Sequence, residues 1–519
     1  MKRYYISIVL ILSFTILTAQ EVSTWDFLSV SSKAEQDDLT KSVLKSDITG
    51  DSLIKLIQSI KYKLAKEKGL IRYENKCIDD TIRDFSVYIP KSYDETKQTP
   101  MFVYLHGGVG MKDILPDSTW QEYLNSLPWM KMAEEKGYIC LFPKGEYTAM
   151  WWDTVGAANI LSQIRIVKQN YNIDNNKVYL AGFSDGASAS YFMAMSHPTD
   201  FACFSPLNGY PGVGNFTHST ETFFVNLSNS QVHAINTDID GLYPAKKIQP
   251  MIKLANSVGA NILFRVYLGI GHRMTYITEE LSNILDFFEE NPRNRFPQKI
   301  VWETINPEQG RCSWLEITET DTLQEKKAWH TDANMKMYDD RLSFGFMDDR
   351  TFEGKGIKVA RITGGKTLCN AVGIKAGDIF LKLDTIDVIS MKDMIRYKRT
   401  AKRGDSVKIV INRNDTLITL NGKFPDIVEY DLFTRKQKSG RIEAEYIANT
   451  FYVQTSRVKS FKLYIHPQMV QIDQNVKVFV NDKLVFDDKV SFDKEFILVN
   501  YYNNRDVNLL YFNNIKIAL

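Results

Sequence analysis

One serine stands in a context that can make its hydroxyl reactive. Residues 178–187 read VYLAGFSDGA, so an apolar, strand-like run ends at Gly182 and the pattern G-x-S-x-G follows with Ser184 at its centre. In a nucleophile elbow this pattern joins a strand to a helix through a turn so tight that the neighbours of the serine must be small. The pattern therefore predicts that Ser184 Oγ projects from the edge of a sheet as a nucleophile.

A serine nucleophile needs a histidine that takes its proton. In chains with this elbow the serine comes first in the sequence, the acid second and the histidine third. We favour His272, because it ends the small-residue loop LGIGH (268–272) directly after a strand-like run at 261–267. The other downstream histidines fit this role less well. His197 lies before a proline at a helix end, and His218 and His233 lie before the expected acid. His330 and His466 lie in other predicted domains.

A carboxylate must hold this histidine in the right tautomer. We expect the strand before it at 221–227, followed by a polar loop with Asp238 and Asp240 and by a helix from near Pro244 to about Val258. Asp240 is favoured because it lies just before that helix, and Asp238 is the alternative. Either aspartate also fits a turn or a helix cap, which is the commonest role of loop aspartates.

A second strand-like run, TPMFVYL at 99–105, ends in His106-Gly107-Gly108. Glycines there would let the backbone approach a substrate oxygen closely. We expect an oxyanion hole made by the N–H of Asp185 and one N–H from the segment Gly107, Gly108 and Val109. His106 is expected to be structural.

These motifs together resemble the secreted esterase and polyhydroxybutyrate-depolymerase-like group of the α/β-hydrolases, which includes feruloyl and acetylxylan esterases. The resemblance covers about residues 80–292 and rests on RDFSVYIP (83–90), VYLHGG (103–108), YNID (171–174), VYLAGFS (178–184) and GH (271–272). It implies hydrolysis of a carboxylic ester through an acyl-serine intermediate without a metal or cofactor. The polar loop that should carry the triad aspartate, 228–240, is longer than we expect for a member of this group.

Length and composition indicate how many domains the chain has and which classes of function they exclude. A chain of 519 residues suggests three to four domains, and its net charge of +2 gives no argument for nucleic-acid binding. Residues 1–20 have a basic start, a short apolar run and small residues at the end, which predicts a secretory signal peptide and no membrane span. The five cysteines are scattered without metal-ligand spacing, so no metal site is expected.

The rest of the chain suggests further domains around an α/β-hydrolase domain with a mostly parallel, doubly wound sheet at 81–297. We expect a helical lead-in at 21–80, a β extension at 298–340 that packs on the hydrolase, and a small β-sandwich at 426–519. Trp151 and Trp152 could line an active-site pocket or pack in the core.

Residues 341–425 are similar to bacterial PDZ domains, on the strength of the turn GIKAGD (373–378) before an apolar strand. The resemblance implies a groove between an edge strand and a helix, in which a peptide C-terminus adds as a strand. The candidate carboxylate loop is Phe344, Gly345 and Phe346. The alternative is a packing module without a ligand.

The sequence thus predicts a secreted or periplasmic serine hydrolase with the triad Ser184, His272 and Asp240, acting on a small-molecule or polymer ester. Two alternatives remain open. One is a serine peptidase of the prolyl-oligopeptidase kind, and the other is a non-catalytic scaffold that presents the PDZ groove.

Overall fold

The computed structural model describes residues 23–63, 67–109, 117–214, 221–339, 342–349, 351–363 and 366–519. The chain divides into two compact units, of which unit 1 is Met1–Ala333 with Arg435–Leu519 and unit 2 is Asn334–Thr434. The expected signal peptide lies outside the described residues. Among the residues that are described, none of the helices is long and apolar enough to cross a membrane.

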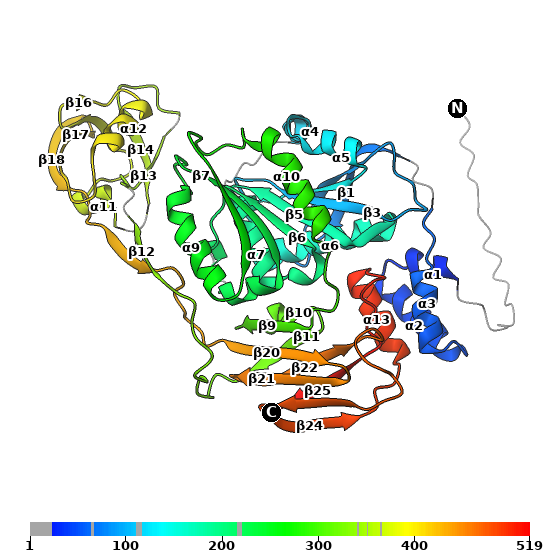
Figure 1. Cartoon of the computed structure of the whole chain (residues 1–519). Coiled ribbons are helices and arrows are strands. Elements are labelled where there is room, and N and C mark those ends of the chain that lie inside the picture. The colour runs from blue at the N-terminus through cyan, green and yellow to red at the C-terminus, as the bar shows by residue number, and fades with distance from the viewer. Residues whose placement is uncertain are drawn as a thin grey trace, which may run out of the picture. The chain divides into compact units, whose positions relative to one another are not determined.

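The larger part of unit 1 is built on one mixed sheet with the strand order β1-β2-β4-β3-β5-β6-β7-β8 (Figure 1). The pairs β1–β2 and β2–β4 are antiparallel, and every other neighbouring pair is parallel. The strands are β1 Gly69–Lys76, β2 Ile82–Ile89, β3 Thr99–Leu105, β4 Ile139–Pro143, β5 Ile173–Phe183, β6 Cys203–Leu207, β7 Gln231–Thr237 and β8 Asn261–Tyr267.

Helices cover both faces of this sheet, which explains why β3, β4, β6 and the second half of β5 are mostly apolar and buried. One face shares a core with α4, α5 and α10, and α6, α7 and α9 lie on the other face (Figure 1). This is the architecture expected for an α/β-hydrolase, and that prediction is confirmed. The helices are α4 Asp117–Ser126, α5 Trp129–Lys136, α6 Thr154–Asn170, α7 Asp185–Ser196, α9 Ala245–Ser257 and α10 Ile277–Glu290.

Two smaller sheets complete unit 1, with orders β24-β23-β21-β20-β9 and β10-β11-β22-β25. They share a hydrophobic core with the helices at both ends of the chain. The elements are α1 Thr24–Ser29, α2 Lys33–Lys45, α3 Gly50–Gln58, β9 Lys299–Thr304, β10 Arg311–Cys312, β11 Leu315–Thr320, β20 Gly440–Ile447, β21 Thr450–Ser456, β22 Val458–Ile465, β23 Val476–Val480, β24 Lys483–Asp488, α13 Lys494–Asn504 and β25 Asn513–Ala518.

These pairings differ from the expected division of the chain. β9 pairs with β20 and β11 pairs with β22, so residues from 298–340 and from 426–519 build the same two sheets. The helices of the lead-in pack against α13 in that core, and β1, also expected in the lead-in, joins the large sheet instead. This arrangement depends on contacts between segments more than 100 residues apart. Such contacts cannot be predicted from the local sequence pattern.

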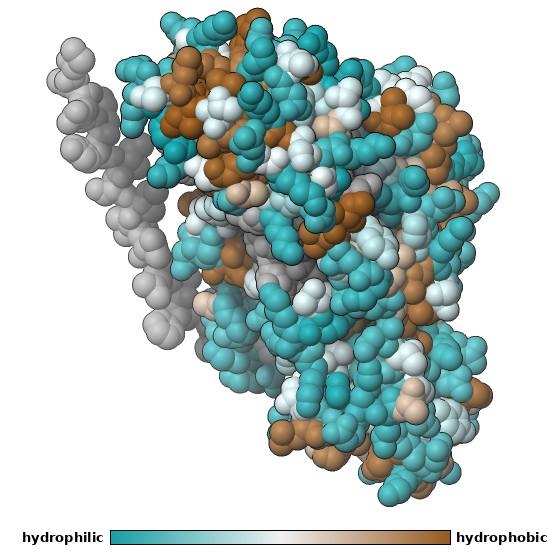
Figure 2. Space-filling view, turned by 90° about the vertical axis from the view of Figure 1, so that its left-hand side faces the viewer, coloured by the Kyte–Doolittle hydropathy of each residue, from teal (hydrophilic) through white to brown (hydrophobic). Residues whose placement is uncertain are grey.

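Unit 2 has its own core and a sheet of order β13-β14-β15-β17-β18, with β16 paired to β15 and with a separate pair β12–β19. The elements are β12 Lys336–Asp339, β13 Phe346–Asp348, β14 Ile357–Ile362, α11 Leu368–Val372, β15 Ile379–Leu383, β16 Ile386–Asp387, α12 Met391–Thr400, β17 Ser406–Arg413, β18 Thr416–Lys423 and β19 Val428–Asp431. The face of the molecule seen in Figure 2 is mostly hydrophilic, with apolar residues in separate patches.

Candidate active site

The serine predicted as a nucleophile lies in a sharp turn between two elements. β5 ends at Phe183 and α7 begins at Asp185, and Ser184 between them has φ of +58° and ψ of −115°. A Cβ on Gly182 would lie 2.3 Å from the backbone of Gly186, and a Cβ on Gly186 would lie 1.9 Å from Leu105 O. Both positions therefore require glycine. A strained residue held by its surroundings is typical of functional sites.

The structure brings His272 to this serine. Its Nε2 lies 2.8 Å from Ser184 Oγ and its Nδ1 lies 2.8 Å from Asp240 Oδ2. Because an ionised carboxylate only accepts hydrogen bonds, Nδ1 carries the proton and the neutral ring presents Nε2 as an acceptor to the serine hydroxyl. Ser184 and His272 are half-buried, whereas the side chain of Asp240 is fully buried.

Four donors surround the carboxylate of Asp240. Oδ1 accepts the N–H groups of Leu242 at 2.7 Å and Tyr243 at 2.9 Å, and Oδ2 accepts from Asn208 Nδ2 at 2.9 Å as well as from His272. Burial alone would raise the pKa of this carboxyl, but the hydrogen bonds outweigh it and hold the pKa of Asp240 below its usual value. The group is therefore ionised at neutral pH.

The alternative acid, Asp238, has other partners. Its Oδ1 accepts the N–H groups of Ile239 at 2.9 Å and Gly269 at 2.8 Å. It thus ties the loop after β7 to the loop after β8, which carries His272. The geometry places Asp240 rather than Asp238 beside the histidine.

The strand before the acid is not where we predicted it. Residues 221–223 form no regular element, a 3-10 helix, η2 Phe224–Asn229, follows them, and the strand is β7, which runs QVHAINT. The side chain of Asn226 explains the difference, because it donates to Met195 O and Glu303 O and accepts from the N–H of Glu303. These bonds hold the 3-10 helix against β9. Because β7 runs later in the chain than the predicted strand, the loop between it and the acid is short.

The expected oxyanion loop lies against the serine. A Cβ on Gly107 would lie 2.8 Å from Ser184 Cβ and 3.4 Å from Ser184 Oγ, and Gly108 has φ of +79°. Val109 is buried, and Asp185 is the first residue of α7, so its N–H lies at the positive end of that helix. The loop and the helix start therefore flank the serine hydroxyl.

His106 holds this loop in place. Its Nε2 accepts the N–H of Gly145 at 3.0 Å and its Nδ1 donates to Gly107 O at 2.8 Å. Burial lowers the pKa of His106 to about 4, so the ring is neutral. Trp151 Nε1 donates to His106 O at 3.0 Å, and Trp151 and Trp152 are both buried. Trp151 thus packs against the loop, and both tryptophans belong to the buried core.

Aromatic rings also contact the histidine of the site. The ring of Phe183 lies 4.9 Å from that of His272, and the ring of Tyr243 lies 5.8 Å from it in an edge-on arrangement. Tyr210 stacks on Tyr243 at 6.2 Å. Neither tyrosine was predicted as a site residue from the sequence. Tyr210 follows the end of β6 and Tyr243 follows the acid, so both lie at the edge of the sheet where site residues gather.

A second serine, histidine and carboxylate meet elsewhere in unit 1. His330 Nδ1 lies 3.0 Å from Ser456 Oγ and Nε2 lies 3.0 Å from Glu303 Oε1, but all three side chains are buried. Asp332 completes the one group of potential metal ligands that the described residues contain, and Lys326 Nζ lies 2.6 Å from its carboxylate. We assign this group to core hydrogen bonding, because it has neither an elbow nor access to solvent for Ser456.

Comparisons with known proteins point to esterases over part of the chain. A bifunctional acetylxylan esterase/xylanase from Neocallimastix patriciarum is 28% identical over 130 residues, which are 24% of this chain and 18% of that protein. Acetylxylan esterase A from Aspergillus oryzae is 29% identical over 104 residues, which are 18% of this chain and 34% of that protein. The chain thus spans less than half the length of either relative. An acetyl xylan esterase structure from Aspergillus awamori covers 42% of this chain and 99% of its own, with 14% identity and a TM-score of 0.33. No protein-family model matches the chain.

Proposed function

We propose that the chain is a serine hydrolase that cleaves carboxylic esters through an acyl-serine intermediate. The observation that carries this proposal is the continuous hydrogen-bonded series from Ser184 Oγ through both ring nitrogens of His272 to Asp240. The similarity to acetylxylan esterases supports an ester as the substrate.

Each residue has a distinct part in the proposed reaction. His272 Nε2 takes the hydroxyl proton as Ser184 Oγ attacks the ester carbonyl carbon, and Asp240 stabilises the imidazolium that forms. The carbonyl oxygen becomes an oxyanion, which the N–H of Asp185 and an N–H from 107–109 stabilise. His272 then gives its proton to the leaving alcohol as the C–O bond breaks, which leaves an acyl-serine. His272 then takes a proton from water as the water oxygen attacks the acyl carbon, and it gives that proton to Ser184 Oγ as the acyl–oxygen bond breaks. This releases the carboxylic acid and regenerates the serine.

We infer an acyl ester on a polysaccharide as the substrate class, because the relatives are acetylxylan esterases. A polyester and a small-molecule ester are the alternatives. The basic and apolar start of the chain, 1–20, favours export to the compartment where such polymers occur.

A substrate panel tests the proposal. The purified protein and Ser184→Ala are offered p-nitrophenyl acetate, p-nitrophenyl butyrate, acetylated xylan, a feruloyl ester and a set of peptide amides. We expect ester turnover that falls by about 10⁶-fold in Ser184→Ala. Cleavage of peptide amides in preference to esters would favour a peptidase. No turnover by wild type above the level of Ser184→Ala would favour the non-catalytic scaffold.

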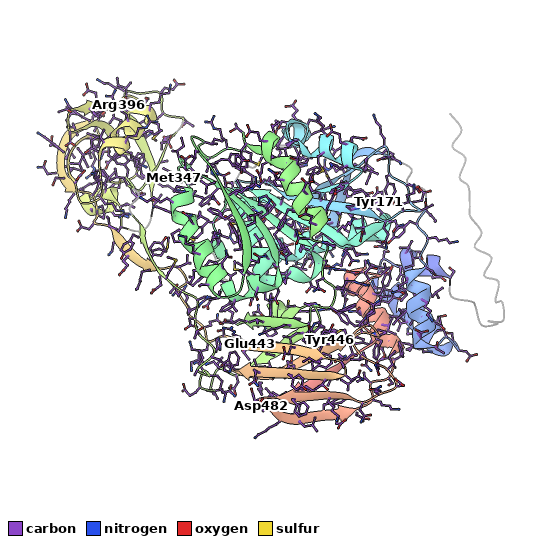
Figure 3. The ribbon with its side chains drawn as sticks, viewed as in Figure 1. Tyr171, Met347, Arg396, Glu443, Tyr446 and Asp482 are labelled. Carbon is purple, nitrogen blue, oxygen red and sulfur yellow. The ribbon has the colours of Figure 1, made fainter. Side chains whose placement is uncertain are left out.

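We also propose that unit 2 binds a peptide C-terminus as PDZ domains do. Among the described residues of unit 2, β13 pairs on one side only, with β14, so its other edge can accept a strand. Phe344, just before this strand, is buried and its ring contacts Tyr397 of α12. Figure 3 labels Met347 on β13 and Arg396 on α12, the two elements between which the groove is expected.

Two fluorescent peptides test this proposal, one with a free C-terminal carboxylate and one with an amidated C-terminus. Their binding to the full chain is measured by fluorescence anisotropy. The free-carboxylate peptide should bind and the amide should not. Gly345→Ala should weaken binding, because Gly345 has φ of +89° and a Cβ there would lie 2.0 Å from Thr367 Oγ1. Equal binding of both peptides, or none by either, contradicts the assignment.

A further inference from the structure

One buried asparagine next to the candidate site has no role in the reaction as proposed so far. Asn208 directly follows β6, is fully buried, and has φ of +59°. Its backbone N–H donates to Ile235 O on β7 at 2.7 Å. Asparagine is one of the few residues other than glycine that adopt this left-handed conformation readily. The backbone therefore aims the amide side chain along the end of the sheet, toward the loop after β7.

The amide of Asn208 makes three hydrogen bonds. Nδ2 donates to Asp240 Oδ2 at 2.9 Å and to Thr237 Oγ1 at 2.7 Å, and Oδ1 accepts from Tyr276 OH at 2.6 Å. These partners fix which way the amide faces. Asp240 can only accept, and Tyr276 remains a donor because burial and the nearby Asp240 charge raise its pKa well above 10.

The series continues to the loop that carries the base. The hydroxyl of Thr237 accepts from Asn208 and donates to Gly271 O at 2.9 Å, and Gly271 is the residue before His272. The side chain of Asn208 thus contacts Asp240 directly and is joined to the loop before His272 through the hydroxyl of Thr237. Both loops must keep their relative positions for the 2.8 Å contact between His272 Nδ1 and Asp240 Oδ2.

We propose that Asn208 is a positioning residue for the triad, which orients Asp240 toward His272 and is itself oriented by Tyr276. This inference rests on the proposed function. Asn208 shares Oδ2 with His272, so it fixes the rotation of the carboxylate while leaving that oxygen one lone pair for the imidazole. Without the amide, Oδ2 has no partner among the described residues other than His272 itself, and only the two bonds to Oδ1 hold the carboxylate in its rotation toward the ring.

The variant for the test is Asn208→Gly, because glycine adopts the left-handed backbone without strain while the side chain with its amide is removed. We expect kcat on p-nitrophenyl acetate to fall on the order of 10- to 100-fold with KM changed less than threefold, which is the range for a misplaced catalytic group. Tyr276→Phe should give a smaller loss, since the amide keeps its donors but loses the partner that orients it.

The matched control is Asn226→Gly, which removes another buried asparagine with three hydrogen bonds from the same unit. Thermal unfolding of both variants measures the loss of stability that each substitution causes. If Asn208 acted only by stabilising the fold, the two folded variants would have the same kcat as wild type below their melting temperatures.

A double-mutant cycle decides whether the effect passes through the acid. Asn208→Gly is made in wild type and in Asp240→Ala, and the ratio of kcat values is compared. We expect the loss caused by Asn208→Gly to fall to less than twofold in Asp240→Ala. The same loss in both backgrounds, or no loss in either, overturns the positioning role. Ser184→Ala in the same assay separates this outcome from failure of the proposed function, because full activity of Ser184→Ala would overturn the function itself.

Discussion

Replacement of Asp240 by asparagine tests the assignment of the acid with a change of one atom. Oδ1 of Asp240 accepts two backbone N–H groups, at 2.7 and 2.9 Å, so the amide oxygen of Asp240→Asn must take that position. Its NH₂ group then faces His272 Nδ1 and the Nδ2 of Asn208, where the wild-type carboxylate accepted from both. Three donors meet where one acceptor is needed.

The histidine relieves this conflict by moving its proton to Nε2, which leaves it unable to accept the proton of Ser184. The same exchange in a serine protease triad lowers kcat by about 10⁴-fold. Four decades of rate correspond to about 5.4 kcal/mol of transition-state stabilisation. We therefore expect Asp240→Asn to lose about 10³- to 10⁴-fold in kcat, with little change in KM.

Asp238→Asn is the matched control from the same loop. Its amide oxygen can still accept the N–H groups of Ile239 and Gly269, so we expect activity within about threefold of wild type. The assay is steady-state hydrolysis of p-nitrophenyl acetate, with circular dichroism to show that both variants are folded. Near-normal activity of Asp240→Asn together with a collapse in Asp238→Asn would refute the assignment.

Three further predictions concern the oxyanion loop, its histidine and the second serine cluster. Gly107→Ala should lower kcat at least 100-fold, because its Cβ would lie 2.8 Å from Ser184 Cβ, and a folded variant with full activity would contradict the placement of the loop. The pKa of His106 is lowered to about 4 while an unfolded histidine titrates near 6.5, so the unfolded state binds the proton first and stability should fall as pH drops from about 6.5 to 4. Urea unfolding at pH 7 and pH 4.5 should show a smaller drop for His106→Gln than for wild type, and an equal drop would exclude this contribution. Ser456→Ala should lower the melting temperature but keep wild-type kcat, and loss of kcat in the folded protein would show that this serine takes part in the reaction.

The tight turn at Ser184 and the position of His272 beside it could be predicted, because local geometry dictates the residues there. Gly182 and Gly186 are required by backbone contacts of 2.3 and 1.9 Å, so the turn is visible in the sequence itself. His272 stands in a short loop directly after the edge strand β8, and the order of elements along the chain then brings it to Ser184.

The strand before the acid could not be predicted from its residues. β7 contains His233, Asn236 and Thr237, all fully buried, and polar side chains of this kind usually indicate a loop. The apolar residues at 223–225 fit a strand better, but the hydrogen bonds of Asn226 to β9, 77 residues away, hold them in a 3-10 helix. Asn208 was missed for the same reason, since its partners Asp240 and Tyr276 lie 32 and 68 residues further along the chain.

Mass spectrometry of the protein after treatment with a fluorophosphonate tests the central claim most directly, because such reagents phosphonylate only an activated serine. Peptide mapping should locate one adduct, on Ser184, in wild type, and His272→Ala should slow its formation strongly. A folded wild-type protein that forms no adduct, or forms it on a different serine, would contradict the account.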